Sequence, residues 1–387
     1  MTALASRIVR DIDVRFLVRA AMAAPSPDNN QPWLFGYAGD RLAVWLDRRR
    51  ALPSDVNGMF DLMAVGAAME NIAIAATQLG LQADVEYRLA GALGAGTQPV
   101  LAATIGFRPG GSRDPLLPHL LSRCTCRRLY RSEPPPPAAL EAMSAAAGRF
   151  AGVDLGWATD LAALRRYAAL IARTDLLRLA YRPFHEELFR QLRFTAAEAQ
   201  ASGDGLDVRT LELPPGGKLL LWALRWWPLM RWLHRLGLGW LLVVPSALAV
   251  WRSGALGILV ADQADSKAFL QGGRALQRVW LEADRQRLAV QPLGSPAIFF
   301  AHQRLLGGRN LPAGHRRILP GLIERFEALA PWVSGRTLLM VFRVGWSKPA
   351  SFRSLRRPVE AVYLPALGGD EPVFDDSRSS VVGRDGF

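Results

Sequence analysis

The chain has 387 residues, of which 50% are hydrophobic and 21% are charged, with 47 basic and 34 acidic residues and a formal net charge of +13. This composition is typical of a globular protein with ample apolar surface for a core, and it excludes a disordered chain. The basic excess is almost all arginine, and no local run of it resembles a nucleic-acid footprint. We therefore expect a phosphate-bearing ligand and no nucleic-acid partner.

Cysteine usage and hydropathy indicate a reduced, cytoplasmic protein. Cys124 and Cys126 are too close in sequence to favour a disulfide, and two thiols cannot complete a tetrahedral zinc site. The five histidines are scattered without metal-ligand spacing, so no metal site is predicted. The N-terminal segment holds no apolar run of signal-peptide length. The longest uncharged piece of the most hydrophobic stretch, 236–251, is shorter than the ~20 residues that span a bilayer.

The first predicted helix, FLVRAAMAA at 16–24, leads into the string APSPDNNQPW at 24–33 and then into a strand at 34–37. Serine and asparagine side chains on a loop held by prolines suit hydrogen bonding to the edge of a planar heterocycle. On physical grounds alone, a capped turn is the commoner outcome of such a string.

Two long buried helices are predicted, and their sequences align. Apolar residues recur at three- and four-residue spacing over 62–79, where Gly80 provides a C-terminal cap, and again over 267–287. Starting from Gly66 and Gly273, GAAMENIAIAATQLGL lies over GRALQRVWLEADRQRL. Each helix is later followed by an apolar strand with a similar ending, ATIGFRP and VFRVGWSKP. These matches indicate an internal duplication.

The duplication divides the chain into a first half, 1–112, and a second half, 113–360. The second half is longer because it carries an insertion at about 195–250. Residues 361–387 are rich in glycine, serine and aspartate towards their end, and we predict a disordered tail there.

A second candidate site is the string RCTCRR at 123–128. Two guanidinium groups flanking the Thr125 hydroxyl suit a phosphate dianion, because arginine pairs with phosphate through bidentate, charge-assisted hydrogen bonds. An arginine cluster taken by itself is more often a solvated face.

The insertion has two interpretations. Between Pro214 and Ala261 there is no acidic residue, and tryptophans alternate with cationic side chains. The tryptophans are Trp222, Trp226, Trp227, Trp232, Trp240 and Trp251. One interpretation is a basic interfacial helix on an anionic membrane, and the other is a lid packed over a ligand.

The string at 24–33 resembles the APS-x-x-N-x-QPW signature of the nitroreductase family of FMN-dependent oxidoreductases. The long helices resemble the LaA-x-x-LGL helices of that family, and SLRRPVE at 354–360 resembles its C-terminal R-x-P-hydrophobic-acid ending. The fused halves are similar to the mycobacterial Acg-type subfamily. This resemblance implies an α+β, nitroreductase-like fold in which two diverged halves form an intrachain pseudo-dimer. It also favours the lid over membrane contact for the insertion.

The resemblance implies one FMN, held by residues of both halves. QPLG at 291–294 falls where the family places a loop under the flavin ring, with the backbone N–H of Gly294 or Ser295 facing it. Arg353 lies near the C-terminal phosphate ligands. The expected cofactor ligands are Pro25, Ser26, Asn29, Gln31, Arg123, Thr125, Arg127, Gly294, Arg356 and Arg357.

The reciprocal site is expected to be lost. In the first half, Val9 replaces the hydroxyl residue and Asp11 stands opposite Arg127, so Arg7 is not expected to hold a phosphate.

The activity implied is NAD(P)H-dependent reduction of a small acceptor such as a nitroaromatic or a quinone. No catalytic acid or base is identified from the sequence. The alternative is an FMN-binding storage protein whose lid blocks catalysis. Self-association is left open.

Overall fold

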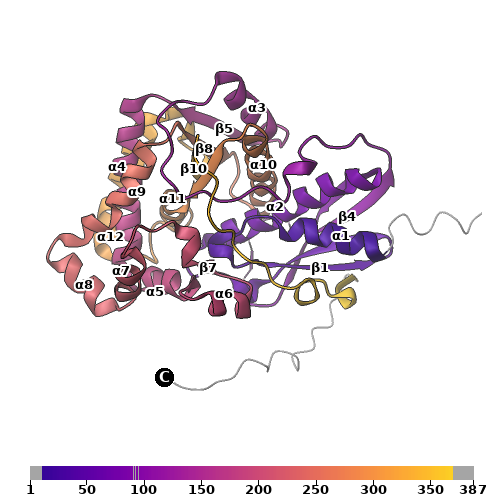
Figure 1. Cartoon of the computed structure of the whole chain (residues 1–387), viewed down its shortest axis with the longest axis horizontal. Helices are drawn as coiled ribbons and strands as arrows, with labels where there is room; N and C mark the ends of the chain where they lie inside the picture. Colours follow the sequence, from indigo (N-terminus) through magenta and orange to yellow (C-terminus); the bar gives the residue numbers. More distant parts are fainter. Residues whose placement is uncertain (1–10, 90, 92, 95, 369–387) are drawn as a thin grey trace, which may run out of the picture.

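The computed structural model describes residues 11–368 apart from 90, 92 and 95, and shows an α+β protein built around two sheets (Figure 1). The first sheet has the strand order β1-β2-β4-β3, with β1 Trp33–Ala38, β2 Arg41–Leu46, β3 Leu81–Tyr87 and β4 Val100–Pro109. The second has the order β5-β8-β10-β9, with β5 Val153–Ala158, β8 Ala255–Ala261, β9 Ala289–Leu293 and β10 Thr337–Gly345. A short parallel pair joins β6 Leu192–Arg193 and β7 Leu206–Asp207.

Helices surround and connect the sheets. They are α1 Asp11–Met22, α2 Met59–Ala76, α3 Pro137–Ala147, α4 Leu161–Ala180, α5 Arg182–Gln191, α6 Ala196–Ser202, α7 Gly217–Leu224, α8 Trp227–Arg235, α9 Val244–Trp251, α10 Ser266–Arg285, α11 Gly294–Leu306 and α12 Ala313–Leu329. The predicted α+β class is confirmed.

The two large sheets share one topology. In each, the first, second, fourth and third strands in chain order are neighbours, and every pairing is antiparallel. A helix precedes the first strand of each sheet, α1 in one and α3 in the other, and the aligned long helices α2 and α10 both lie between the second and third strands. The sequence correspondence between the halves thus coincides with a correspondence of topology.

Helices α2 and α10 pack against each other at the centre of the molecule (Figure 1). A Cβ atom added at Gly66 would lie 2.0 Å from the carbonyl oxygen of Leu270, and one at Gly273 would lie 1.9 Å from that of Met63. Met63 stands in the alignment where Leu270 does, so the contact is reciprocal, as at a two-fold interface.

The first long helix has the extent that its periodicity predicts. After α2 the chain makes a 3-10 turn, Thr77–Leu79, and Gly80 takes the left-handed conformation at φ 68°. The segment Val56–Leu79 is long and apolar enough to cross a membrane by composition, but 94% of its most apolar window is buried inside the protein. A helix buried to this extent is a core helix that other elements of the protein surround.

The insertion is larger than the sequence indicates. In the first sheet a tight turn joins β1 to β2, whereas in the second the equivalent connection, from β5 to β8, runs through residues 159–254 and includes α4 to α9. The predicted start near 195 is therefore wrong. Helix α4 packs against α9, α11 and α12. Because it is a packed helix of the fold, its sequence has the periodicity of a core helix and does not mark it as part of an insertion.

The predicted tail begins too early. Residues 361–368 cover the outer edge of the first sheet: Leu364 N–H donates to Phe35 O at 2.8 Å, and Trp45 Nε1 donates to Leu367 O at 3.1 Å. These contacts order the segment because they satisfy the open edge of β1 and bury Leu367. Residues 369–387 lie outside the described residues, and so do Arg7 and Val9.

Candidate functional site

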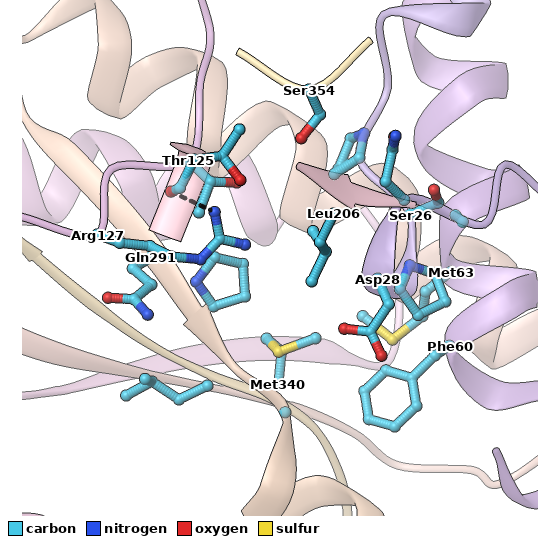
Figure 2. Close-up of a pocket in the computed structure, with 18 of the residues that line it drawn as sticks. Ser26, Asp28, Phe60, Met63, Thr125, Arg127, Leu206, Gln291, Met340 and Ser354 are labelled. Carbon is cyan, nitrogen blue, oxygen red and sulfur yellow. Dashed lines mark hydrogen bonds between the residues drawn. The ribbon is translucent and has the colours of Figure 1, made fainter. Parts of the chain in front are cut away.

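A cavity of about 570 Å³ lies where the two halves meet. Its apolar wall comes from both long helices, with Met63 and Ala67 on α2 and Leu276 and Trp280 on α10. Figure 2 shows Thr125 and Arg127 on one side of the pocket and Asp28, Met63 and Phe60 on the other. The volume is within the ~300–1,000 Å³ of typical small-molecule and cofactor sites.

The loop after α1 has an unusual backbone conformation. Asp28, Asn29 and Gln31 have φ values of 45°, 59° and 51°, and Ser26 Oγ accepts the N–H of Gln31 at 3.0 Å. Pro25, Ser26 and Asn29, three of the expected cofactor ligands, line the cavity. Asparagine and aspartate tolerate this left-handed conformation better than most residues.

Asn29 uses its amide within the protein. Its Nδ2 donates to the carbonyl oxygens of Gly205 at 2.9 Å and Leu355 at 3.1 Å, while its Oδ1 accepts from Arg356 at 3.0 Å. Asn29 therefore positions Arg356 and joins the loop to the insertion and to the C-terminal segment.

Two predicted ligands lie outside the cavity lining. Gln31 is fully buried and donates to Gly203 O at 2.9 Å, while its Oε1 accepts the backbone N–H of Arg357 at 3.0 Å. The guanidinium of Arg357 donates to Ala361 O. Neither residue lines the cavity, and both side chains bind the protein's own backbone.

The string at 123–128 runs beside β9. Thr125 forms a β-bridge with Val290, and Cys126 N–H donates to Val290 O at 3.1 Å. Arg123, Cys124, Thr125 and Arg127 line the cavity, whereas Cys126 is buried outside the lining. The predicted trio is therefore brought together.

Four arginines, Arg123, Arg127, Arg353 and Arg356, line the cavity. Within residues 11–368, gaps excepted, none of them is within ion-pair distance of a carboxylate. Burial, and next the charge of Arg356, lower the pKa of Arg123 to about 9. Burial, and next the charge of Arg353, lower the pKa of Arg356 to about 10. The pKa of Arg127 is lowered mainly by burial.

Two of these arginines bind backbone carbonyl dipoles. Arg356 donates to Met22 O and to Ala24 O, and Arg123 Nη2 donates to Ala23 O at 2.8 Å, all carbonyls at the negative end of α1. Arg123 also stacks over Trp280 at 4.5 Å, and its buried Nε has no partner in the described structure. A buried donor without a partner costs free energy, so this group favours an anionic ligand.

The segment predicted as a loop under a flavin is instead a strand followed by a helix. Residues 291–293 end β9, and Gly294 is the first residue of α11. Gly294 and Ser295 nevertheless line the cavity. Because the first N–H groups of a helix have no intrahelical acceptor, the start of α11 supplies backbone donors there.

Sequence reasoning missed a polar group at the opposite wall. Arg178 on α4 pairs with Asp28 at 3.1 Å, and Ser246 on α9 donates to Asp175. All four residues line the cavity. Three of them belong to the insertion, and no local motif marks them, since only the tertiary fold brings α4 and α9 to the loop after α1.

Asp55 caps the start of α2 beside this group. It accepts the N–H groups of Phe60 at 3.0 Å and Asp61 at 2.9 Å. Burial first, and then the charge of Glu187, raise the pKa of Asp55 to about 7. The folded chain therefore binds this proton more tightly than the unfolded chain. The stability contributed is complete below pH ~4 and is lost as the pH rises through about 7.

We expect Asp55→Asn to reduce the loss of stability between pH 5 and pH 8 by on the order of 1–3 kcal/mol, because asparagine cannot ionise. The measurement is the free energy of unfolding by denaturant titration at both pH values. The control is Asp84→Asn at an exposed position of β3. Identical pH profiles for wild type and Asp55→Asn would contradict this assignment.

No protein-family model matches the chain. A curated relative, the uncharacterized protein MT1398 of Mycobacterium tuberculosis (strain CDC 1551 / Oshkosh), is 30% identical over 355 residues, which cover 90% of this chain and 48% of the relative. The chain thus spans about half the length of the curated relative that it matches.

Similar solved structures include nitroreductases. The FMN-dependent nitroreductase NfnB from Mycobacterium smegmatis, in complex with NADPH, is 15% identical, with a TM-score of 0.37 over 63% of this chain and 94% of that one. A nitroreductase with bound FMN from Bacteroides fragilis is 9% identical, with a TM-score of 0.35 over 63% and 95%. A protein from Anabaena variabilis that is named as a candidate nitroreductase is 9% identical, with a TM-score of 0.38 over 80% of this chain and 69% of that one.

Proposed function

We propose that this chain binds one FMN in the cavity between its halves and acts as an oxidoreductase of the nitroreductase type. The observation that carries the proposal is the group of four cavity-lining arginines, which have no acidic partner among the described residues. A phosphate monoester is a dianion that such guanidinium groups bind through charge-assisted hydrogen bonds. The arginines adjoin an apolar wall that suits a flat aromatic ring.

The residues of the cavity fit FMN. Arg123, Thr125, Arg127 and Arg353 would hold the phosphate and the polar chain, with the unpartnered Nε of Arg123 among the available donors. Pro25, Ser26 and the backbone at Gly294 would surround the ring. The flavin, when bound, supplies the redox chemistry, while the protein orients it and provides positive charge. NAD(P)H is the proposed donor, and a small molecule in a cytoplasmic setting is the proposed acceptor.

The arrangement of the halves supports one cofactor per chain. The loop at 25–29 belongs to the first half, 1–112, and the string at 123–127 to the second, 113–360, and both line one cavity. Together with the common topology and the reciprocal contact at Gly66 and Gly273, this supports an Acg-type fusion in which one chain takes the place of a homodimer.

We expect the purified protein to bind flavin at one FMN per chain, and anaerobic addition of NADH or NADPH to bleach the flavin absorbance nearly stoichiometrically. Absorbance spectroscopy under argon measures both quantities. If dithionite reduces the bound flavin and neither nucleotide does, the protein is a flavin store and not an oxidoreductase. Two FMN per chain would instead show that the reciprocal site has been retained.

A further inference from the structure

The tryptophan-rich part of the insertion does not cover the cavity. The insertion contributes to the cavity wall through α4, α5, the segment 206–211 and Ser246 of α9, whereas no residue of α7 or α8 lines the cavity. These two helices lie at the side of the molecule opposite the first sheet (Figure 1). The expectation that the tryptophans form a lid is therefore wrong, and their exposure needs another explanation.

This region exposes large apolar side chains to an unusual degree. Trp226 is 65% exposed, Trp232 and Trp240 are each 55% exposed, and Leu219 is 71% exposed. In the part of the chain that the structure describes, more than half of the strongly exposed large hydrophobic side chains lie between Leu219 and Trp251. Contiguous exposed apolar surface of this kind marks an interaction site. We call residues 218–241 the tryptophan face.

The tryptophan face is anchored on the protein side. Leu224 and Met230 are buried, and the Leu224 carbonyl accepts a hydrogen bond from the His185 ring at 2.9 Å. Lys218, Arg225, Arg231 and Arg235 are exposed beside the tryptophans, and Arg225 stacks over Trp222 at 4.4 Å. No acidic residue occurs in this stretch.

The positive charge of the tryptophan face indicates which kind of partner it binds. An isologous contact with a second copy would bring these cations against their own equivalents, which is unfavourable. A lipid bilayer with anionic headgroups offers partners for both the cations and the exposed tryptophans. Tryptophan suits the membrane–water boundary because its apolar ring system faces the lipid while its N–H stays in the polar layer. The helices α8 and α9, with the turn between them, bend by 112°, so this region suits lying on a bilayer rather than crossing it.

We propose that the tryptophan face docks this protein on the surface of an anionic phospholipid bilayer, with the tryptophans at the headgroup level and the four cations against lipid phosphates. This proposal does not depend on flavin binding or on the proposed redox activity, and it is tested separately from them.

The test is flotation of the full-length protein with phospholipid vesicles. Wild type should float with vesicles of phosphatidylcholine containing roughly 30% phosphatidylglycerol and remain unbound with phosphatidylcholine alone. About 0.5 M salt should weaken the binding by screening. Arg225→Glu/Arg231→Glu should weaken it about 30-fold or more, since each cation near an anionic surface contributes about fivefold. Trp226→Ser/Trp232→Ser should also weaken it.

The matched control is Arg108→Glu/Arg113→Glu, which makes the same change in net charge at exposed positions at and just after the end of β4. It should bind vesicles within a few-fold of wild type. Equal loss in both arginine pairs would show that only net charge attracts the protein, and that result would overturn the proposal. So would failure of wild type to bind anionic vesicles. If the tryptophan variant instead converts a dimer to a monomer in sedimentation velocity, with no vesicle binding, the face joins two copies of the chain.

Discussion

Replacing Arg127 by alanine is expected to weaken FMN binding by about 2–5 kcal/mol, roughly 30-fold to several thousand-fold, the range for removing one partner of a buried charged pair. Arg127 faces the cavity, forms no ion pair within the described structure and donates only to Thr210 O at 3.1 Å. Its charge is therefore available to a phosphate. Arg123→Ala should have an effect of the same order, because its Nε is buried and unpartnered.

The control for this prediction is Arg357→Ala. Arg357 also belongs to an arginine-rich string, but its guanidinium donates to Ala361 O and does not line the cavity. It should bind FMN within a few-fold of wild type. Arg7→Ala should likewise retain the flavin. The measurement is a fluorescence titration of the apoprotein with FMN, with thermal unfolding to verify the fold. Equal losses in Arg127→Ala and Arg357→Ala would contradict the proposed site.

The second large effect is expected at the crossing of the long helices. Gly66→Ala should lower the free energy of unfolding by about 3 kcal/mol, and Gly273→Ala by a similar amount. At each position the added Cβ would meet a backbone carbonyl of the other helix, at 2.0 Å and 1.9 Å, and a backbone cannot move aside as a flexible side chain can. Because α2 and α10 also form the apolar wall of the cavity, both variants should lose affinity for FMN.

Gly321→Ala provides the matched control. Gly321 lies in helix α12, is exposed and has nothing within 4 Å of the position of an added Cβ. There alanine should stabilise the protein by up to ~1 kcal/mol, through its higher helix propensity. Denaturant titration of the three variants measures the difference. If Gly66→Ala is as stable as Gly321→Ala, the two helices do not cross as closely as described.

Several parts of the site could be predicted because their signals are local. The loop at 25–29 and the string at 123–127 are short motifs whose residues act together, and both line the cavity. Gln31 and Arg357 belong to the same motifs, yet they bind backbone groups of the protein. A motif identifies which residues are near a site, whereas backbone dihedrals decide which of their side chains enter it.

The sequence by itself determined the α+β class, the two long core helices and the equivalence of Gly66 with Gly273, because periodicity and chain order are local properties. Only the tertiary structure decided that Asp28, Asp175 and Arg178 share one wall, since these residues come from segments far apart in the chain. It also decided where the tryptophans of the insertion lie. Their apolar character is the same in a buried lid and on an exposed face, and burial depends on which elements pack against them.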